Sequence, residues 1–139
     1  MPVHHEIDQK HQLIISSWSG EASDDEFIQA LTRYQIEVRG HGDYQHYNEL
    51  LDFRDITTFN LTTKGLIEMG RIARKTDRND MQTRLALVVK TPLGFGLARM
   101  YITYRNLEAN SHKILKVFKN KTDALSWLSR SSEPTESEP

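Results

Sequence analysis

The residues best suited to chemistry are two aspartates that flank an arginine. Asp52 and Asp55 lie on either side of Arg54 in the segment NELLDFRDI, residues 48–56. Two carboxylates can share acid and base work when their surroundings separate their pKa values. Ion pairs that serve structure alone are more common, so we favour a pairing of Arg54 with one acid. Asp55 would then accept hydrogen bonds from backbone amides in a turn, and we expect no catalytic residue.

Thr62 and Thr63 follow this segment at the expected start of a helix. A threonine hydroxyl at that position caps the helix and contributes about 1 kcal/mol. A phosphate attached there would instead lie in the positive field of the helix N-terminus and would change the surface charge. We favour capping and keep a phosphoacceptor as the alternative, with Asp55 in the same contact loop.

Motifs for metal, nucleotide or nucleophile chemistry are absent from the sequence. None of the six histidines forms the helical pair with a nearby acid that is typical of zinc sites. The turn TPLGFG at residues 91–96 matches neither a dinucleotide fingerprint nor a P-loop, and there is no GxSxG motif. The sequence has no cysteine, which excludes thiolate chemistry. We therefore expect no metal, no cofactor and no enzymatic activity.

Composition places the chain among single-domain globular proteins. Its 139 residues correspond to roughly one domain, and 37% of them are hydrophobic and 27% charged. A formal net charge of -1 argues against a dedicated nucleic-acid binder, which normally carries a basic excess.

Neither a leader nor a membrane span is expected. The first residues, MPVHHEID, lack the basic start and the apolar core of a secretory signal. The richest apolar stretch, residues 93–107, is short and contains Arg99 and Arg105, so it does not predict a membrane-spanning helix. We expect a cytoplasmic protein.

The hydrophobic pattern predicts strands and helices that alternate along the chain. Strands are expected at residues 3–8, 12–18, 49–54, 84–90 and 112–119. Gly20 is expected to end the second strand and Asp55 to mark the exit of the third. Helices are expected from a capping box at Ser23 to Gly40, from Thr62 or Thr63 to residue 73, from Thr91-Pro92 to Asn106, and at 122–128.

This order predicts an α/β fold with right-handed crossovers between parallel strands. We expect a single domain over residues 1–128, with a mixed, mostly parallel sheet of four to five strands, an opening antiparallel hairpin and about four packed helices. Residues 129–139 are rich in serine, glutamate and proline, which is typical of a disordered polar tail.

The helix expected at residues 93–107 carries apolar side chains around more of its circumference than one buried stripe needs. Leu97, Met100, Tyr101 and Tyr104 are therefore candidates for the wall of an apolar ligand cavity, for a partner contact or for a homodimer contact. A helix embedded in its own core is an equal alternative.

Several segments resemble bacterial STAS-like (SpoIIAA-like) proteins related to the sporulation anti-sigma-factor antagonists. They are LLDFRDIT, the threonine-capped helix, ALVV followed by FGLARMY, and the closing DALSWL. The resemblance extends from the hairpin to Leu128. It implies a sheet of four or five strands with packed helices, no catalytic activity and a role as a protein-binding switch.

The resemblance also implies a site. In the antagonists, a serine or threonine at the start of the helix after the central strand is phosphorylated, in a motif that reads roughly Asp-Ser-Ser/Thr-Gly. The matching region here is NLTTKG, residues 60–65, where asparagine replaces the acid and the glycine is displaced. Thr62 and Thr63 are the residues that correspond to the phosphoacceptor.

The FGLARMY segment is similar to a less characterised branch, whose apolar helices imply binding of a lipid-like ligand or a membrane surface. We therefore expect a non-enzymatic regulatory or protein-interaction module. The alternative is a carrier or sensor of a small apolar, lipid-like ligand.

Overall fold

The computed structural model describes residues 3–39, 42–76, 82–107 and 113–129. Five strands form one sheet in the order β1-β2-β3-β4-β5. They are β1 (Val3–Asp8), β2 (Leu13–Ser23), β3 (Asn48–Asn60), β4 (Thr83–Val88) and β5 (Lys113–Phe118). The β1–β2 pair is antiparallel and the other neighbouring pairs are parallel, which confirms the predicted mixed sheet with an opening hairpin.

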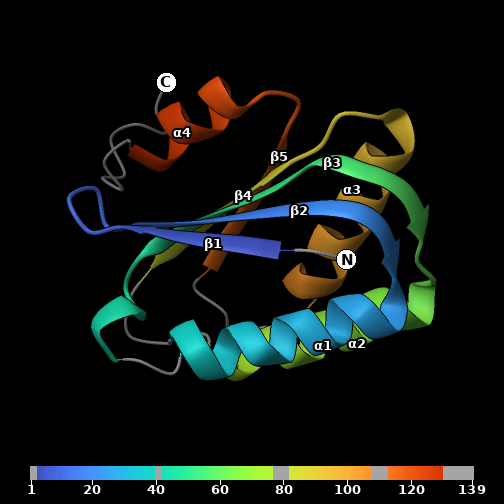
Figure 1. Cartoon of the computed structure of the whole chain (residues 1–139), viewed down its shortest axis with the longest axis horizontal. Helices are drawn as coiled ribbons and strands as arrows, with labels where there is room; N and C mark the ends of the chain where they lie inside the picture. Colours follow the sequence, from blue (N-terminus) through green and yellow to red (C-terminus); the bar gives the residue numbers. More distant parts are fainter. Residues whose placement is uncertain (1–2, 40–41, 77–81, 108–112, 130–139) are drawn as a thin grey trace.

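The helices cover both faces of this sheet. They are α1 (Asp24–Tyr34), α2 (Thr63–Ala73), α3 (Pro92–Asn106) and α4 (Lys121–Ser129), with a π-helical turn at Gln35–Arg39 and short 3-10 helices at Gly42–Tyr44 and Arg74–Thr76. The helices α1, α2 and α3 lie on one face, and α4 lies on the other (Figure 1). The predicted α/β fold is therefore confirmed.

Three helices begin at caps that the sequence marks. The side chains of Ser23, Thr62 and Thr91 each accept a hydrogen bond from the backbone amide three residues on. Pro92 occupies the first turn of α3, where its missing amide costs nothing. Capping by Thr62 and Thr91 is thus confirmed.

Two predicted strand ends are wrong. Gly20 does not end β2; it adopts a positive φ of 83° beside a register shift, and β2 continues to Ser23. Asp55 does not mark the exit of β3, because Ile56 to Asn60 continue the strand and pair with the extended end of β2. The ends of β2 and β3 remain paired with each other past these two residues, across local shifts in their register.

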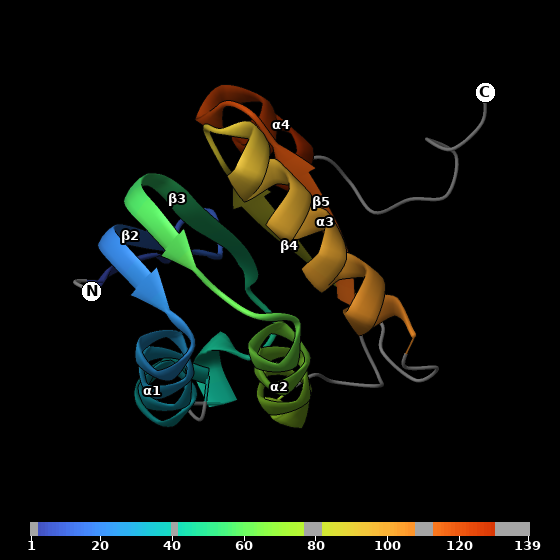
Figure 2. The same cartoon turned by 90° about the vertical axis from the view of Figure 1, so that its right-hand side faces the viewer.

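The central strand β3 has unequal neighbours. Its pairing with β2 runs from Asn48 to Asn60, whereas its pairing with β4 covers Glu49 to Asp52. Figure 2 shows β3 separating from β4 beyond that ladder, with α2 and α3 on either side of the opening. This strand lies between two parallel neighbours from Glu49 to Asp52, and beyond Asp52 its described residues do not pair with β4.

The two faces of the sheet have different cores. The face under α4 is a small, closed cluster of Leu13, Leu50, Ala86, Val88, Ala124 and Leu128. The opposite face carries the alternate residues of β3 and β4, among them Leu51, Phe53, Leu85 and Leu87, together with the aromatic residues of β2 and α1.

The predicted start of the polar tail at Ser129 is wrong, because Ser129 is the last residue of α4. The rest of the predicted tail and Gly40, the predicted end of the first helix, lie outside the described residues. In the part of the chain that the structure describes, no helix is both long and apolar enough to cross a membrane.

Candidate functional site

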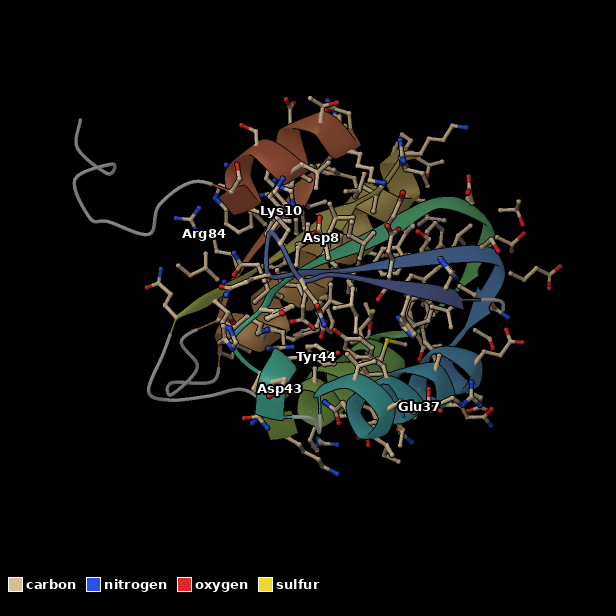
Figure 3. All side chains as sticks on the ribbon, turned by 60° about the vertical axis from the view of Figure 1, so that its left-hand side comes forward. Asp8, Lys10, Glu37, Asp43, Tyr44 and Arg84 are labelled. Carbon is tan, nitrogen blue, oxygen red and sulfur yellow. The ribbon has the colours of Figure 1, made fainter. Side chains whose placement is uncertain are left out.

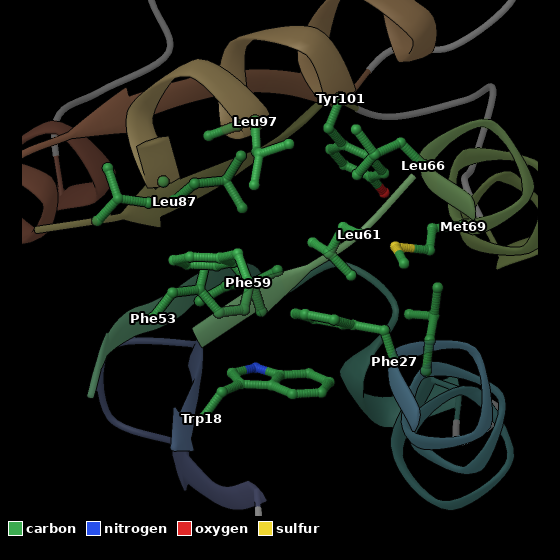
Figure 4. Close-up of a pocket in the computed structure, with 15 residues that line it drawn as sticks. Trp18, Phe27, Phe53, Phe59, Leu61, Leu66, Met69, Leu87, Leu97 and Tyr101 are labelled. Atoms are coloured by element: carbon green, nitrogen blue, oxygen red, sulfur yellow. The ribbon is translucent and has the colours of Figure 1, made fainter. Parts of the chain in front are cut away.

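A cavity of about 80 Å³ lies where β3 leaves β4. Its walls come from β2, β3, β4 and the helices α1, α2 and α3 (Figure 4). The labelled lining residues are Trp18, Phe27, Phe53, Phe59, Leu61, Leu66, Met69, Leu87, Leu97 and Tyr101. Among the described residues that line it, none is charged. Such a lining favours binding of an apolar group rather than acid–base chemistry.

Aromatic rings hold one wall of the cavity. Trp18 stacks on Phe27 with ring centroids 4.7 Å apart, and Phe53 meets Phe27 edge-on at 5.5 Å. These rings keep their positions through mutual packing, which adds about 0.5–1.5 kcal/mol per pair beyond area burial. The wall is therefore built into the fold.

Gly94 brings the start of α3 against the other side. A Cβ atom there would lie 3.3 Å from the Phe59 ring and 3.2 Å from Thr91 Oγ1. The glycine thus permits close helix–strand packing.

The indole nitrogen of Trp18 is a buried polar atom in the wall of this apolar cavity. The residue is 4% exposed, and Nε1 has no hydrogen-bond acceptor among the described residues. Figure 4 shows its nitrogen edge turned toward the cavity, on the side of Phe53 and Phe59. A buried donor left unbonded costs about 1–3 kcal/mol, so the position of this group needs an explanation.

A second cavity, of about 50 Å³, adjoins the first and shares Trp18, Leu31, Leu51 and Tyr101 with it. Apart from Ala73 and Leu85, its remaining lining residues carry polar or charged groups. Glu49 on β3 accepts a 2.5 Å hydrogen bond from the Tyr34 hydroxyl and forms an ion pair with the Lys113 ammonium from β5.

The ion pair lies deep in the protein. Glu49 is 4% exposed and Lys113 8%. Buried charges persist when they are paired and hydrogen-bonded, as here. The pair ties β3 to β5 across β4.

His5 and Ser16 extend this polar group to β1 and β2. His5 Nδ1 and Ser16 Oγ form a 2.7 Å hydrogen bond, and the His5 ring lies 4.9 Å from the Tyr34 ring. Burial lowers the pKa of His5, although the Glu37 carboxylate acts in the opposite direction. We call His5, Ser16, Tyr34, Glu49 and Lys113 the polar cluster.

Of the two aspartates that flank Arg54, Asp52 is the one that the guanidinium binds. The Arg54 guanidinium binds Asp52 in a bidentate manner, with Nε and Nη2 donating at 2.9 and 2.8 Å. Burial raises the pKa of Asp52, but the hydrogen bonds and charge of Arg54 outweigh it, so this pKa is lowered. The predicted ion pair is confirmed. Asp55 is exposed within β3, so its predicted place in a turn is wrong.

Thr62 joins the N-termini of α1 and α2. Its hydroxyl donates to Asp24 Oδ2 at 2.5 Å, and its backbone amide donates to Asp24 Oδ1 at 3.0 Å. The same hydroxyl accepts from the Gly65 amide at 3.0 Å. Thr62 and Thr63 are both exposed.

An open groove runs between α1 and α2 beside these threonines. Its volume is about 690 Å³, and it is lined by Asp24, Asp25, Ile28, Thr63, Lys64, Gly65, Ile67, Glu68 and Arg71. Thr63 lies in the groove, whereas Asp55 is not part of its lining.

The four candidate residues on α3 separate into two groups. Leu97 and Tyr101 line the apolar cavity. Met100 is 37% exposed, and Tyr104 packs beside the core of α1 and α2 without lining the cavity. Sequence reasoning missed Trp18. The available signal was its position two residues after Ser16 in an expected strand, which places both side chains on the same face of the sheet.

Among the described residues, no group of three histidine, aspartate or glutamate side chains is placed to hold a metal ion. Figure 3 shows the polar side chains Asp8, Lys10, Glu37, Asp43, Tyr44 and Arg84 spread over the surface rather than gathered at one point.

Comparison with known proteins gives one informative match. No protein-family model matches the chain. No curated protein matches it either. A solved structure, that of an uncharacterised DUF3478-family protein with a SpoIIAA-like fold from Shewanella loihica PV-4, aligns with a TM-score of 0.55 at 16% identity, over 91% of this chain and 92% of that one. The strand order and helix placement described above, together with this match, show that the chain has a SpoIIAA-like fold.

Proposed function

We propose that this chain is a non-enzymatic binding protein that holds a small apolar molecule, or the apolar end of a larger one, in the cavity where β3 leaves β4. The observation that carries the proposal is the uncharged, largely aromatic and aliphatic lining of that cavity. Its volume of about 80 Å³ is several times the roughly 10–15 Å³ that one water needs. It is also about half of the roughly 150 Å³ of an engineered cavity that binds benzene or xenon.

The size restricts the ligand. A whole lipid does not fit, so a long chain would place only its end inside. Phe59, Leu61 and Leu97 line the cavity and are half-buried, so they offer the route from solvent. An apolar group that enters there gains dispersion contacts with walls that are already in place.

Xenon tests the cavity without any assumption about the natural ligand. Under xenon pressure we expect shifted methyl resonances for Leu61, Leu87 and Leu97. The methyl resonances of Leu13 and Leu50, which lie in the closed cluster under α4, should stay unchanged. Equal shifts at both sets, or none at all, would contradict the proposal.

A pair of variants gives a second test. Leu61→Trp places a large ring at the cavity opening and should abolish the xenon shifts of Leu87 and Leu97. Ile114→Trp adds the same ring at a 42% exposed position on β5 that does not line the cavity, and should leave them intact. Native mass spectrometry of the freshly purified chain would then identify any ligand that co-purifies.

A second candidate function is a regulatory protein contact on the α1–α2 groove. It is favoured by the exposed, mixed lining of the groove, in which Ile67 is 40% exposed between acidic and basic side chains. The partner would be another protein or a second copy of this chain, in the cytoplasm. Exposed Asp55 is a further candidate contact residue outside the groove lining.

Phosphorylation would regulate such a contact at Thr62 or Thr63. The Thr62 hydroxyl is engaged by Asp24 and Gly65, and a phosphate there would face the Asp24 carboxylate. Thr63 is exposed in the groove, so we expect it to be the better acceptor. Incubation with kinases of the source cell and phosphopeptide mapping checks this, and label at neither threonine would count against the switch.

A further inference from the structure

Ser16 and Trp18 are neighbours on one strand and differ in whether their polar groups are hydrogen-bonded. Ser16 and Trp18 lie on β2, both are nearly fully buried, and both line the second cavity. The Ser16 hydroxyl has a hydrogen-bond partner in His5 at 2.7 Å. The Trp18 N–H has none among the described residues, and it faces the apolar cavity (Figure 4).

Among the described residues, the protein supplies no good hydrogen-bond acceptor for this N–H inside the cavity. The rings of Phe27 and Phe53 lie next to the indole, at centroid distances of 4.7 and 5.8 Å. A phenyl face is at best a weak acceptor. A molecule within the cavity that carried an oxygen acceptor would complete the hydrogen bonding of Trp18.

The same lining determines the charge of that oxygen. An ionised carboxylate buried without a cation is strongly disfavoured, and no basic side chain lines the apolar cavity among the described residues. Two basic side chains line the adjoining cavity, and both are engaged: Lys113 is paired with Glu49, and the Arg105 guanidinium donates to the Tyr101 hydroxyl at 3.0 Å. A neutral oxygen with one short apolar arm on each side satisfies both the N–H and the walls.

We propose that the cavity ligand is an uncharged apolar molecule that bears a carbonyl oxygen, and that Trp18 Nε1 donates a hydrogen bond to this oxygen. The inference rests on the proposed apolar-ligand function and adds the chemical class of the ligand. Trp18 would fix the orientation of the ligand, while the aromatic and aliphatic walls supply most of the contact area.

Cyclopentanone and cyclopentane form a matched probe pair, because they have nearly the same shape and differ in one carbonyl oxygen. We expect cyclopentanone to bind about fivefold more tightly, as one net hydrogen bond would give. The chain has two tryptophans, Trp18 and Trp127, and each gives its own indole N–H resonance. The Trp18 resonance should move downfield with the ketone, whereas Trp127, which packs on Phe118 near α4, should not move.

Substitution then isolates the donor. Trp18→Phe keeps an aromatic ring but removes the N–H. The carbonyl oxygen of cyclopentanone would then be buried without a donor, so the preference should be lost or reversed in favour of cyclopentane. Trp127→Phe is the control and should retain the fivefold preference. If Trp18→Phe does not fold, the probe comparison in the wild-type chain still decides.

The outcomes separate the two proposals. Cyclopentane and cyclopentanone that bind equally well to the wild-type chain, with an unmoved Trp18 resonance, would overturn the role of Trp18 and leave the apolar binding function standing. Probes that both fail to shift the cavity methyl resonances would overturn both.

Discussion

The polar cluster and the apolar cavity adjoin on one face of the sheet, and they satisfy their buried polar atoms in opposite ways. Glu49, Tyr34 and Lys113 bind one another, and Ser16 binds His5. Trp18, next on the same side of β2, presents a donor without an acceptor among the described residues. The bonded polar atoms join strands and helices, whereas the unbonded donor beside the apolar cavity is the one that we propose binds a ligand.

Removing one partner of the buried ion pair should have the largest effect. Glu49→Gln leaves the Lys113 ammonium uncompensated at 8% exposure, and we expect a loss of about 3–5 kcal/mol in the free energy of unfolding, measured with urea. Glu68→Gln removes the exposed pair with Arg71 and should change stability by less than about 0.5 kcal/mol. Similar losses in both variants would show that the polar cluster is no more structural than the surface.

Truncation of apolar side chains compares the packing of the two regions. Ile14 is fully buried beside Tyr34, so Ile14→Ala should cost about 2–5 kcal/mol. Leu97 is half-buried and already borders the cavity, so Leu97→Ala should cost about 1 kcal/mol. Urea unfolding of both variants checks this, and an equal cost would mean that the cavity wall is as tightly packed as the core.

The threonines beside the α1–α2 groove give a smaller difference. Thr62→Ala removes the cap of α2 and the hydroxyl contact with Asp24, and we expect a loss of about 1–2 kcal/mol. Thr63→Ala, one residue later on the exposed surface, should stay within about 0.5 kcal/mol. Thermal unfolding of the pair measures this, and the reverse order would assign the cap to Thr63.

The smallest expected effect is on the pH dependence of stability, which tests His5 of the polar cluster. The pKa of His5 is lowered in the folded state by burial, so the unfolded chain binds the proton more readily. The contribution of neutral His5 is fully present above about pH 6.5, the ordinary histidine value, and is lost as pH falls through the lower folded pKa. His5→Asn should therefore flatten the loss of stability in urea between neutral and mildly acidic pH. A slope equal to that of the wild-type chain would remove His5 from the explanation.

Local signals predicted most of the fold. The capping residues Ser23, Thr62 and Thr91 mark helix starts because a cap depends on the next three residues alone. The antiparallel hairpin and the alternation of strands with helices follow from short-range patterns in the same way. The Arg54–Asp52 pair was also within reach, since its members are two residues apart.

Of the cavity, the helical pattern predicted Leu97 and Tyr101, which do line it. The other cavity walls and the polar cluster were not predictable from local patterns. Glu49 was expected to be an ordinary strand residue, and its partner Lys113 is distant in the sequence. The extension of β3 past Asp55 depends on pairing with the end of β2, which no window around Asp55 contains. Because the cavity forms where β3 and β4 diverge, its residues become neighbours only in the folded sheet.

The contact between Asp24 and Thr62 has a consequence for how this sequence can vary. A Cβ atom at Gly65 would lie 2.1 Å from Asp24 Oδ1, so no larger residue fits while that carboxylate keeps its place. Positions 24 and 65 are therefore expected to change together during evolution, with a side chain at 65 only where a shorter residue stands at 24. Among divergent homologues, that covariation would reveal a shared joint between α1 and α2 even where overall similarity has faded.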